Sequence, residues 1–399
     1  MDKVLIILGA SEFGVLAGKN LGFKVIVISP RSTGISTKVT DQAESIIIVN
    51  SLEDEEEIYQ KVNDILKIYK KIDLVISFTE LGLKSASIIS EKLNLPTNHL
   101  EVIESTRNKS LMRKIFLKSD ILKLNYKAGL ISNFHHQELP IQTPFIIKPL
   151  DGYGSKNVSF IENHEEWTEW HLKNKEDNDT KWIVEPYIEG PEYSIEAISS
   201  KGKHFILGIT EKDTTGKPNF IETGHSVPAS LNQDLYDQII HLTKESLTLI
   251  GVEYGPSHIE VKWDNKNNKI VIIEMHTRPG GDYIPYLHTL STGIDQYEIG
   301  IRSYYDPSVL ELVMTKHVKH SSIKFLTFAE GILLSKGFSD KISDENIKEW
   351  DIYYNIGEKV KETADSYSRA GHIIVSSNSR ESNKQSFNSF IKNLLIKIY

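Results

Sequence analysis

The sequence contains no cysteine and no long apolar run. Without cysteine the chain has no disulfides, no thiolate metal sites and no cysteine nucleophile. No segment approaches the roughly 18 consecutive apolar residues that are needed to span a bilayer. The start, Met1-Asp2-Lys3 followed by a short apolar run, lacks the basic and apolar segments of a signal peptide. We therefore expect a cytoplasmic protein without a membrane partner.

The chain also has no excess of positive charge. It carries 46 Lys and Arg against 54 Asp and Glu, for a net charge of −8. This balance does not favour binding to nucleic acid or to an anionic membrane surface. The hydrophobic share of 39% and the charged share of 25% are those of a globular protein. Because 399 residues exceed the size of one ordinary core, we expect two or three domains.

The first hundred residues alternate between apolar strand patterns and helical patterns. Continuous apolar runs of this kind are typical of buried parallel strands. The expected strands are Val4–Leu8, Lys24–Ile28, Ile46–Val49 and Leu74–Phe78, and the clearest helices are Asp54–Tyr69 and Leu83–Leu93. Strand, turn, helix and strand in succession predict a doubly wound α/β domain.

A glycine turn after the first strand raises the alternative of dinucleotide binding. Gly9 and Gly14 are present, but Ser11 stands where the middle glycine of the dinucleotide fingerprint belongs. The second strand is followed by Ser29-Pro30-Arg31 and not by an acidic residue. An incomplete glycine motif is a weak signal, so a nicotinamide-dependent oxidoreductase is disfavoured.

Two alternating segments in the second half predict a β-hairpin. Ser257–Trp263 and Ile270–His276 alternate with period two and flank the polar loop Asp264–Lys269. The expected apolar rows are Ile259, Val261 and Trp263 on one strand and Val271, Ile273 and Met275 on the other. The opposite face carries His258, Glu260 and Lys262, then Glu274, His276 and Arg278.

A symmetric register sets Glu260 opposite Glu274 and His258 opposite His276. Like charges directly opposite each other are destabilising. A cation between the carboxylates or a proton shared by them could offset the repulsion. Mg²⁺ favours a few carboxylate oxygens together with those of a bound polyphosphate. The alternative is a solvated hairpin whose polar face meets only water.

Other segments have a functional and a structural interpretation. The strand Thr143–Lys148 ends in a lysine beside the glycine loop Asp151–Val158, which suits a polyphosphate but also a plain hairpin turn. Residues 101–124 read as one helix in which Lys109 and Arg113 share a face, and on its own this pattern indicates a solvated basic face.

The remaining pattern predicts helices and strands further along the chain. We expect helices at Glu165–Lys175 and at Gln233–Leu249. Another helix is expected after Tyr286 and continues to about Tyr305, and a last helix lies near Lys384–Ile398. Strand character is expected at Lys181–Ile188, Lys324–Leu334 and Ile373–Val375, with Ser376–Asn388 as a loop.

Four blocks, taken together and in order, resemble the ATP-grasp carboxylate–amine ligases, above all the L-amino-acid ligases that make dipeptides. The blocks are Arg107-Asn108-Lys109 with Arg113, Ile147-Lys148-Pro149 with its glycine loop, Glu185-Pro186-Tyr187-Ile188 with Gly190 and Glu192, and the hairpin through Gly281. The resemblance implies an N-terminal doubly wound α/β domain over residues 1–105, an ATP-grasp core of two α+β subdomains over 106–320 with a lid at about 145–190, and a small C-terminal α+β domain over 321–399.

The resemblance also implies roles for individual residues. ATP would be bound by Lys109, Lys148, Gly152, Gly154, Ser155, Glu185, Tyr187, Ile188 and Glu192. Mg²⁺, with Mn²⁺ as a substitute, would be held by Glu260, Glu274 and His276, the last of which replaces a common Asn. Lys148, Lys262 and Arg278 would be catalytic. Substrates would meet Glu80, His258, Arg278, Gly280, Gly281 and Asp282.

Two further segments bear on this resemblance. Ser368-Arg369-Ala370-Gly371-His372 resembles a late motif of these ligases, and Asn157 stands where their glycine loop usually has glycine. Asn tolerates a positive φ better than most residues.

The activity that the resemblance implies is ATP-dependent joining of a carboxylate, such as an amino acid, to an amine through an acyl phosphate. The partners are then small molecules, and a homodimer is allowed. The alternatives are a ligase that loads a carrier protein or acts in purine-type biosynthesis, and a nucleotide-binding protein without chemistry.

Overall fold

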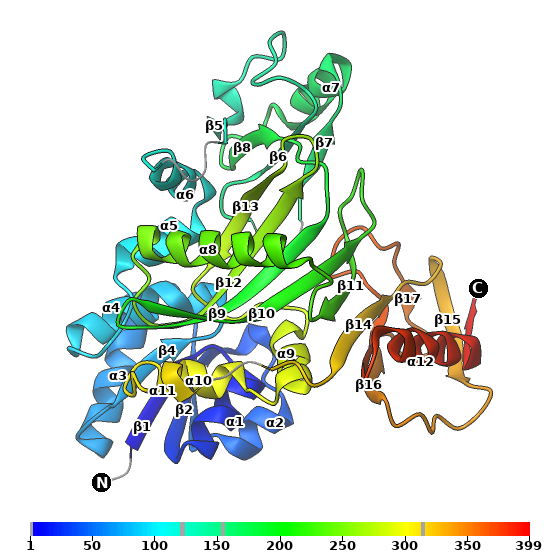
Figure 1. Ribbon diagram of the computed structural model, residues 1–399. Coiled ribbons are helices and arrows are strands. Elements are labelled where there is room, and N and C mark those ends of the chain that lie inside the picture. Colours follow the sequence, from blue (N-terminus) through cyan, green and yellow to red (C-terminus); the bar gives the residue numbers. More distant parts are fainter. Residues whose placement is uncertain (1–2, 120–123, 153–155, 313–315) are drawn as a thin grey trace.

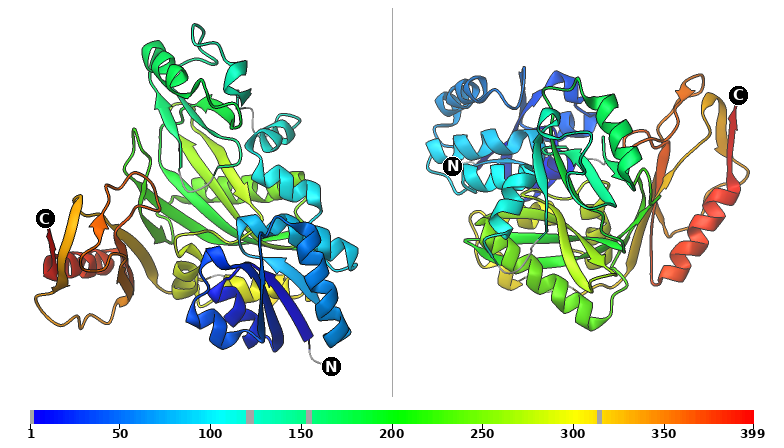
Figure 2. Two further views of the ribbon diagram at one scale, coloured as in Figure 1. Left: turned by 180° about the vertical axis from the view of Figure 1, so that it is seen from behind. Right: turned by 90° about the horizontal axis from the view of Figure 1, so that it is seen from above.

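A computed structural model describes residues 3–119, 124–152, 156–312 and 316–399. Its strands form four sheets, and the largest runs through the middle of the molecule (Figure 1). From behind and from above, the N-terminal domain (blue) and the C-terminal end of the chain (red) lie apart from each other (Figure 2). No described helix has the length and apolar character that crossing a lipid bilayer requires.

The N-terminal domain is built on a four-stranded parallel sheet with the order β3-β2-β1-β4. Its strands are β1 (Lys3–Leu8), β2 (Phe23–Pro30), β3 (Ser45–Val49) and β4 (Leu74–Ser77). Its helices are α1 (Glu12–Asn20), α2 (Thr37–Gln42), α3 (Glu55–Tyr69) and α4 (Leu83–Lys92), with short 3-10 turns η1 (Arg31–Thr33) and η2 (Glu80–Gly82). Separate apolar clusters cover the two faces of the sheet, so the doubly wound prediction is confirmed.

The helical character expected over residues 101–124 is confirmed up to Phe116, but the chain breaks at Asn108 and forms two helices. This residue has extended backbone angles, and its side chain accepts hydrogen bonds from the amides of Ser110 and Leu111. It therefore ends α5 (Leu100–Arg107) and caps α6 (Lys109–Phe116). The solvated basic face is wrong, since Lys109 and Arg113 are only 4% and 3% exposed.

The described part of residues 127–186 forms a small antiparallel sheet with the order β5-β8-β6-β7 and one helix (Figure 1). We name this unit the lid because it contains most of the lid expected at about 145–190, and its closure stays a prediction. The elements are β5 (Lys127–Leu130), η3 (Ile131–Asn133), β6 (Phe145–Pro149), β7 (Ser159–Ile161), α7 (His164–Asn174) and β8 (Lys181–Pro186). Phe145, Trp167 and Trp182 are buried between the sheet and α7 and form its core. This separate core lets the lid keep its shape apart from the large sheet.

The large sheet has eight strands in the order β13-β12-β9-β10-β11-β14-β18-β16. Their bounds are β9 (Glu192–Ser200), β10 (Lys203–Thr214), β11 (Glu222–Val227), β12 (Gly255–Asp264), β13 (Lys269–His276), β14 (His320–Leu326), β16 (Ile347–Ile352) and β18 (Gly371–Ser377). The helix α8 (Gln233–Ile250) packs on one face and completes the main core. After β13 come α9 (Ile284–Thr292), α10 (Gln296–Arg302) and α11 (Val309–Leu312).

The C-terminal region departs from the predicted pattern in three places. Lys324–Leu334 is not one strand, because β14 ends at Leu326 and β15 (Gly331–Phe338) begins a second sheet with β17 (Lys359–Val360) and β19 (Leu394–Ile398). Most of the expected loop Ser376–Asn388 belongs to α12 (Arg380–Asn393), which Ser379 caps. The last helix therefore ends at Asn393, and β19 follows. The large sheet combines strands from both sides of the expected boundary at residue 320 between the ATP-grasp core and the C-terminal domain. The domain limits therefore stay a prediction.

The register predicted for the hairpin is confirmed at its functional end. Glu260 pairs with Glu274 and His258 with His276. The register then shifts, since Val261 pairs with Ile272 and leaves Ile273 as the extra residue of a bulge.

The bulge changes which side chains of β13 face the core. Ile270, Ile272 and Met275 enter the main core, whereas Val271 and Ile273 pack with Leu124 and Ile188 on the other face. The expected apolar row of Val271, Ile273 and Met275 is therefore wrong for its first two members.

Gly190 joins the lid to the hairpin at a very close backbone approach. Its φ is +153°, and a Cβ built there would lie 1.8 Å from the Trp263 carbonyl oxygen. Beside it, the Trp263 amide donates to the Pro191 oxygen and the Asn265 amide to the Glu189 oxygen.

We predict that Gly190→Ala lowers the free energy of unfolding by about 2–3 kcal/mol, because the backbone must move or be strained. Urea unfolding followed by circular dichroism measures the change. The control is Gly337→Ala, since nothing lies within 4 Å of a Cβ at that position. Equal stability of both variants would show that the close approach does not constrain the chain.

Candidate active site

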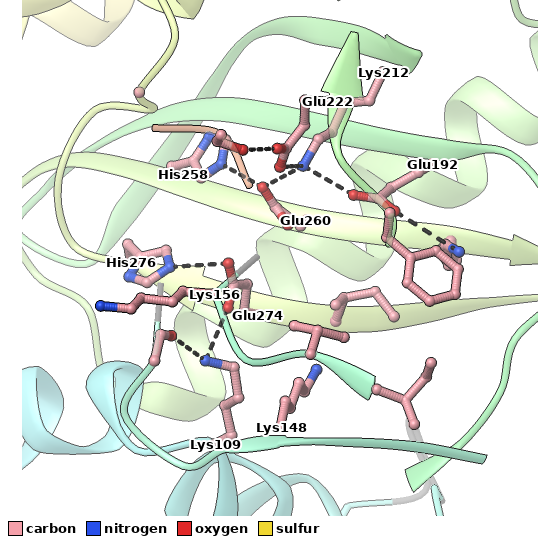
Figure 3. Close-up of a pocket in the computed structure, with 18 of the residues that line it drawn as sticks. Lys109, Lys148, Lys156, Glu192, Lys212, Glu222, His258, Glu260, Glu274 and His276 are labelled. Carbon is pink, nitrogen blue, oxygen red and sulfur yellow. Dashed lines mark hydrogen bonds and ion pairs between the residues drawn. The ribbon is translucent and has the colours of Figure 1, made fainter. Parts of the chain in front are cut away.

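A cavity lies between the lid, the hairpin β12–β13 and the middle of the large sheet. Figure 3 shows Lys109 and Lys148 on one side and Glu192, Lys212 and Glu260 on the other. The wall also includes residues of the segment after β13 and of the C-terminal domain, Gly281, Asp282, Ser366, Tyr367 and Arg369. All the principal parts of the chain except the N-terminal sheet therefore contribute to one space.

The paired carboxylates of the hairpin are each held by a lysine. Lys212 Nζ lies 2.5 Å from Glu260 Oε1, and Lys109 Nζ lies 3.0 Å from Glu274 Oε2. Burial acts to raise the pKa of both carboxyls, but the lysines and neighbouring histidines outweigh it and lower the pKa of each. The repulsion expected from the register is thus offset by cations of the protein, and both groups are ionised at neutral pH.

Lys212 is a residue that the sequence analysis missed. It lies in β10, a strand that was not predicted, and its ammonium also lies 2.8 Å from Glu192 and 3.7 Å from Glu222. Its three carboxylate partners come from β9, β11 and β12. No local pattern could reveal it, because the cluster exists only once these strands are paired.

Glu185 holds two cations at the lid side of the cavity. Its carboxylate accepts from Arg113 Nε at 2.5 Å and lies 3.1 Å from Lys148 Nζ. Burial alone would raise the pKa of Glu185, but Arg113 and Lys148 bring it down to about 2. Arg113 also donates to the carbonyl of Ile273, the bulge residue. The lid lysine is therefore tied to the hairpin through Glu185 and Arg113.

One end of the cavity is apolar. Leu124, Ile188 and Ile273 form one wall. Tyr187 and Phe220 also line the cavity, with ring centres 5.9 Å apart, and the Lys262 ammonium lies 5.5 Å and 5.6 Å from those ring centres. Burial lowers the pKa of Lys262, although Glu192 acts in the opposite direction. Apolar and aromatic side chains of this kind suit a planar heterocycle.

Arg278 is fixed by a carboxylate of the N-terminal domain. Arg278 Nε donates to Glu80 at 2.6 Å, and His276 Nδ1 lies 3.0 Å from the same carboxylate. Burial favours a higher pKa for Glu80, but His276 and Arg278 lower it to about 2. Glu80 lies behind these two side chains and does not line the cavity. Its direct contact with substrate stays a prediction.

A buried carboxylate that the sequence analysis did not single out, Glu196, fixes the turn after the hairpin. It lies 2.5 Å from His258 Nδ1 and accepts from the Gly280 amide at 3.2 Å and from Gln296 at 2.9 Å. Burial alone would lower the pKa of His258, but Glu196 and then Glu260 raise it to about 9. A Cβ at Gly280 would lie 2.7 Å from the His258 ring, so glycine permits this approach.

Asp282 lies at the far end of the cavity. Its backbone has a left-handed conformation, with a φ of 52°. Both of its oxygens accept from Arg369, at 2.6 Å and 2.7 Å, and His225 Nε2 lies 3.3 Å away. The Arg369 guanidinium in turn stacks 3.5 Å from the centre of the Phe325 ring. The late motif of the sequence thus closes the cavity from the C-terminal domain.

Most of the predicted site residues meet in this cavity. Its wall contains Lys109, Lys148, Gly152, Glu185, Tyr187, Ile188, Glu192, His258, Glu260, Lys262, Glu274, His276, Arg278, Gly281 and Asp282. Gly280 lies behind His258, and Gly154 and Ser155 lie outside the described residues. Asn157 has a φ of 59°, so the left-handed turn expected there is present. The individual roles stay predictions.

The hairpin fits a magnesium ion only in part. Among the described residues, no group of three or more His, Cys, Asp or Glu side chains is placed to hold a metal alone. Glu260 and Glu274 are nevertheless paired, ionised and directed into the cavity. One or two carboxylates together with substrate phosphates are what Mg²⁺ uses in nucleotide sites. The donor set therefore fits an ion that arrives with a polyphosphate.

Comparison with known proteins gives a consistent result. Residues 141–285 match a family model described as an ATP-grasp domain. The chain is similar to the alanine–anticapsin ligase of Bacillus subtilis, with 26% identity over 271 residues that cover 61% of this chain and 56% of the relative. The chain spans about half the length of the first curated relatives it matches.

Solved structures resemble the whole chain. The L-amino acid ligase from Bacillus licheniformis has a TM-score of 0.85 at 21% identity, covering 100% of this chain and 99% of that one. The phosphoribosylglycinamide synthetase from Anaerococcus prevotii has a TM-score of 0.78 at 21% identity, covering 100% of both chains. At this identity the likeness concerns the fold, and the predicted architecture of an α/β domain, an ATP-grasp core and a C-terminal extension is confirmed.

We predict that Glu185→Gln lowers the free energy of unfolding at neutral pH by about 3 kcal/mol, because Arg113 and Lys148 lose the negatively charged partner that they share. The pKa of Glu185 falls from 4.5 to about 2, so its stabilisation is present above about pH 4.5 and is lost as the pH falls towards 2. The stability difference between variant and wild type should therefore shrink over that range.

Urea unfolding at a series of pH values measures this difference, and exposed Glu189→Gln is the control. A difference that is constant from pH 7 to pH 3 would contradict the assigned charge of Glu185.

Proposed function

We propose that this member of the ATP-grasp superfamily is an ADP-forming carboxylate–amine ligase that makes amide or peptide bonds. One observation carries the proposal. A facing pair of ionised carboxylates, the two lysines Lys109 and Lys148, and a fixed arginine share one cavity that has an apolar wall. This arrangement offers a place for each part of ATP and for a carboxylate next to its terminal phosphate.

The position of ATP follows from the two ends of the cavity. The adenine would lie against the apolar wall of Leu124, Ile188 and Ile273, and Glu192 would accept hydrogen bonds from the ribose. Lys148 and Lys109, which converge on the hairpin acids, would bind the phosphates. Glu260 and Glu274 would hold Mg²⁺, which would supply positive charge for phosphoryl transfer.

In the first step the carboxylate of one substrate attacks the γ-phosphorus of ATP. A new O–P bond forms, the bond to the bridging oxygen breaks, and ADP leaves an acyl phosphate behind. Lys148 balances the growing negative charge, and its own position is set by Glu185 at 3.1 Å. The lid must cover the reacting groups, since water would hydrolyse the acyl phosphate.

In the second step an amine attacks the acyl carbon. The carbonyl oxygen becomes an oxyanion, the C–O bond to phosphate breaks, and inorganic phosphate and an amide are formed. Arg278 lines the cavity. Its Nε donates to Glu80 at 2.6 Å and its Nη1 donates to the Pro279 carbonyl at 3.0 Å, so the plane of the guanidinium is fixed. A preorganised cation of this kind stabilises an oxyanion without reorganising.

An amino acid is the carboxylate substrate that we propose, because the relatives and neighbours named above include amino-acid ligases. Loading of a carrier protein and a role in purine-type biosynthesis are the second candidates, and the similarity to a phosphoribosylglycinamide synthetase favours the latter of these. We place the reaction in the cytoplasm, where ATP is available. A homodimer stays a prediction.

The function is tested by measuring phosphate release over pairs of amino acids with ATP and Mg²⁺. Release that needs two amino acids, with the joined product in the mass spectrum, supports the ligase. Release that needs glycine and phosphoribosylamine supports the purine-type role. A protein that binds ATP but releases no phosphate with any substrate pair has no ligase activity in this panel, which would favour a nucleotide-binding role without chemistry.

We predict that Arg278→Ala lowers turnover roughly 10²–10³-fold while ADP affinity stays unchanged, because Arg278 acts on the acyl group. Phosphate release and isothermal titration calorimetry give the two values. The control is Arg31→Ala, an exposed position in the N-terminal domain. Unchanged turnover of Arg278→Ala would remove this residue from the mechanism.

A further inference from the structure

Lys212 is a buried cation that three carboxylates share. Its side chain is 2% exposed, and its ammonium lies 2.5 Å from Glu260, 2.8 Å from Glu192 and 3.7 Å from Glu222. Burial alone would lower the pKa of Lys212, but Glu192, Glu260 and Glu222 raise it. Lys212 lines the cavity but has no role in the proposed reaction steps.

The contact of Lys212 with Glu260 falls on one particular atom. Lys212 Nζ and His258 Nε2 both approach Oε1, at 2.5 Å and 3.2 Å. Figure 3 shows Lys212 between Glu260 and Glu192, on the side of Glu260 away from Glu274. A divalent ion that binds the Glu260–Glu274 pair must share the Glu260 carboxylate with this ammonium.

Two cations at one buried carboxylate repel each other strongly, because little water screens them. Lys212 therefore weakens the binding of a divalent ion to Glu260 for as long as it stays on that carboxylate. Its other two carboxylate partners, Glu192 and Glu222, allow the Lys212 ammonium to move away from Glu260. Since Glu192 is already at 2.8 Å and Glu222 at 3.7 Å, the ammonium can leave Glu260 with a small displacement and remain paired.

We propose that Lys212 and the divalent ion compete for Glu260, so that Lys212 makes metal binding depend on the nucleotide. Without nucleotide, Lys212 neutralises Glu260 and the ion binds weakly. With nucleotide, the phosphates add negative charge and ligand oxygens beside Glu274. The affinity for the ion then becomes high enough for it to bind Glu260, and Lys212 moves towards Glu192 and Glu222. The coupling is reciprocal, so the ion strengthens nucleotide binding by the same factor. This inference rests on the proposed function.

Lys109 differs from Lys212 in this respect. It lies on Glu274 at 3.0 Å, but its ammonium also donates to the carbonyl of Gly152 at 2.7 Å, at the start of the glycine loop. Lys109 is thus connected to the loop expected to cover the phosphates, whereas the partners of the Lys212 ammonium among the described residues are all carboxylates. Lys212 is the lysine whose removal leaves the predicted phosphate contacts in place.

The test is Mn²⁺ binding, measured from the free-ion signal in electron paramagnetic resonance, with and without ADP. In the full-length wild type, Mn²⁺ should bind weakly alone and more tightly with ADP. In Lys212→Met the affinity for Mn²⁺ without ADP should rise roughly tenfold, and the gain on adding ADP should shrink by the same factor. Lys212→Arg, which keeps the charge, should restore the weak binding, and Lys203→Met, at an exposed position of the same strand, should behave as wild type.

Lys212→Gln replaces the methionine variant if the latter lacks the wild-type circular dichroism spectrum. Mn²⁺ affinity without ADP that is equal to or weaker than that of the wild type would overturn the proposal for Lys212. A wild type that takes up no Mn²⁺ even with ADP would instead contradict the proposed function, so the two failures are distinguishable.

Discussion

The structure depends on two carboxylates that the pairing of β12 with β13 sets opposite each other. The register places Glu260 against Glu274 on a buried face, and charge repulsion there is tolerated only because cations converge on it. Lys109 comes from α6 and Lys212 from β10. Lys148 and Glu185 both belong to the lid, and Arg113 joins Glu185 to the Ile273 carbonyl of the hairpin.

The same constraint organises the surroundings of Arg278. Glu80 of the N-terminal domain fixes Arg278 and meets His276, and Glu196 fixes His258 and the Gly280 amide. Arg278, His276 and His258 are therefore each held by a carboxylate on the side away from the cavity. A cavity whose charged groups are fixed in this way needs little reorganisation during a reaction, which is what phosphoryl and acyl transfer require of an enzyme.

Much of this could be predicted from the sequence, and the failures have physical causes. The register of the hairpin could be predicted because apolar and polar residues alternate regularly on both sides of a polar loop. The bulge at Ile273 was not, since an extra residue between two isoleucine-rich stretches leaves no mark on the pattern, yet it turns Val271 and Ile273 towards the apolar end of the cavity. Lys212 and Glu196 were missed because their partners belong to other strands. The breaks at Asn108 and Ser379 were missed although both are residues that commonly cap helices.

The phosphates of a nucleotide are proposed to reach the hairpin acids through a divalent ion, and a crystal structure of the protein with Mg²⁺ and ADP can test this. We predict one Mg²⁺ at about 2.1 Å from oxygens of both Glu260 and Glu274 and of the nucleotide phosphates. A nucleotide bound outside the cavity, or a metal ion that contacts neither carboxylate, would contradict it.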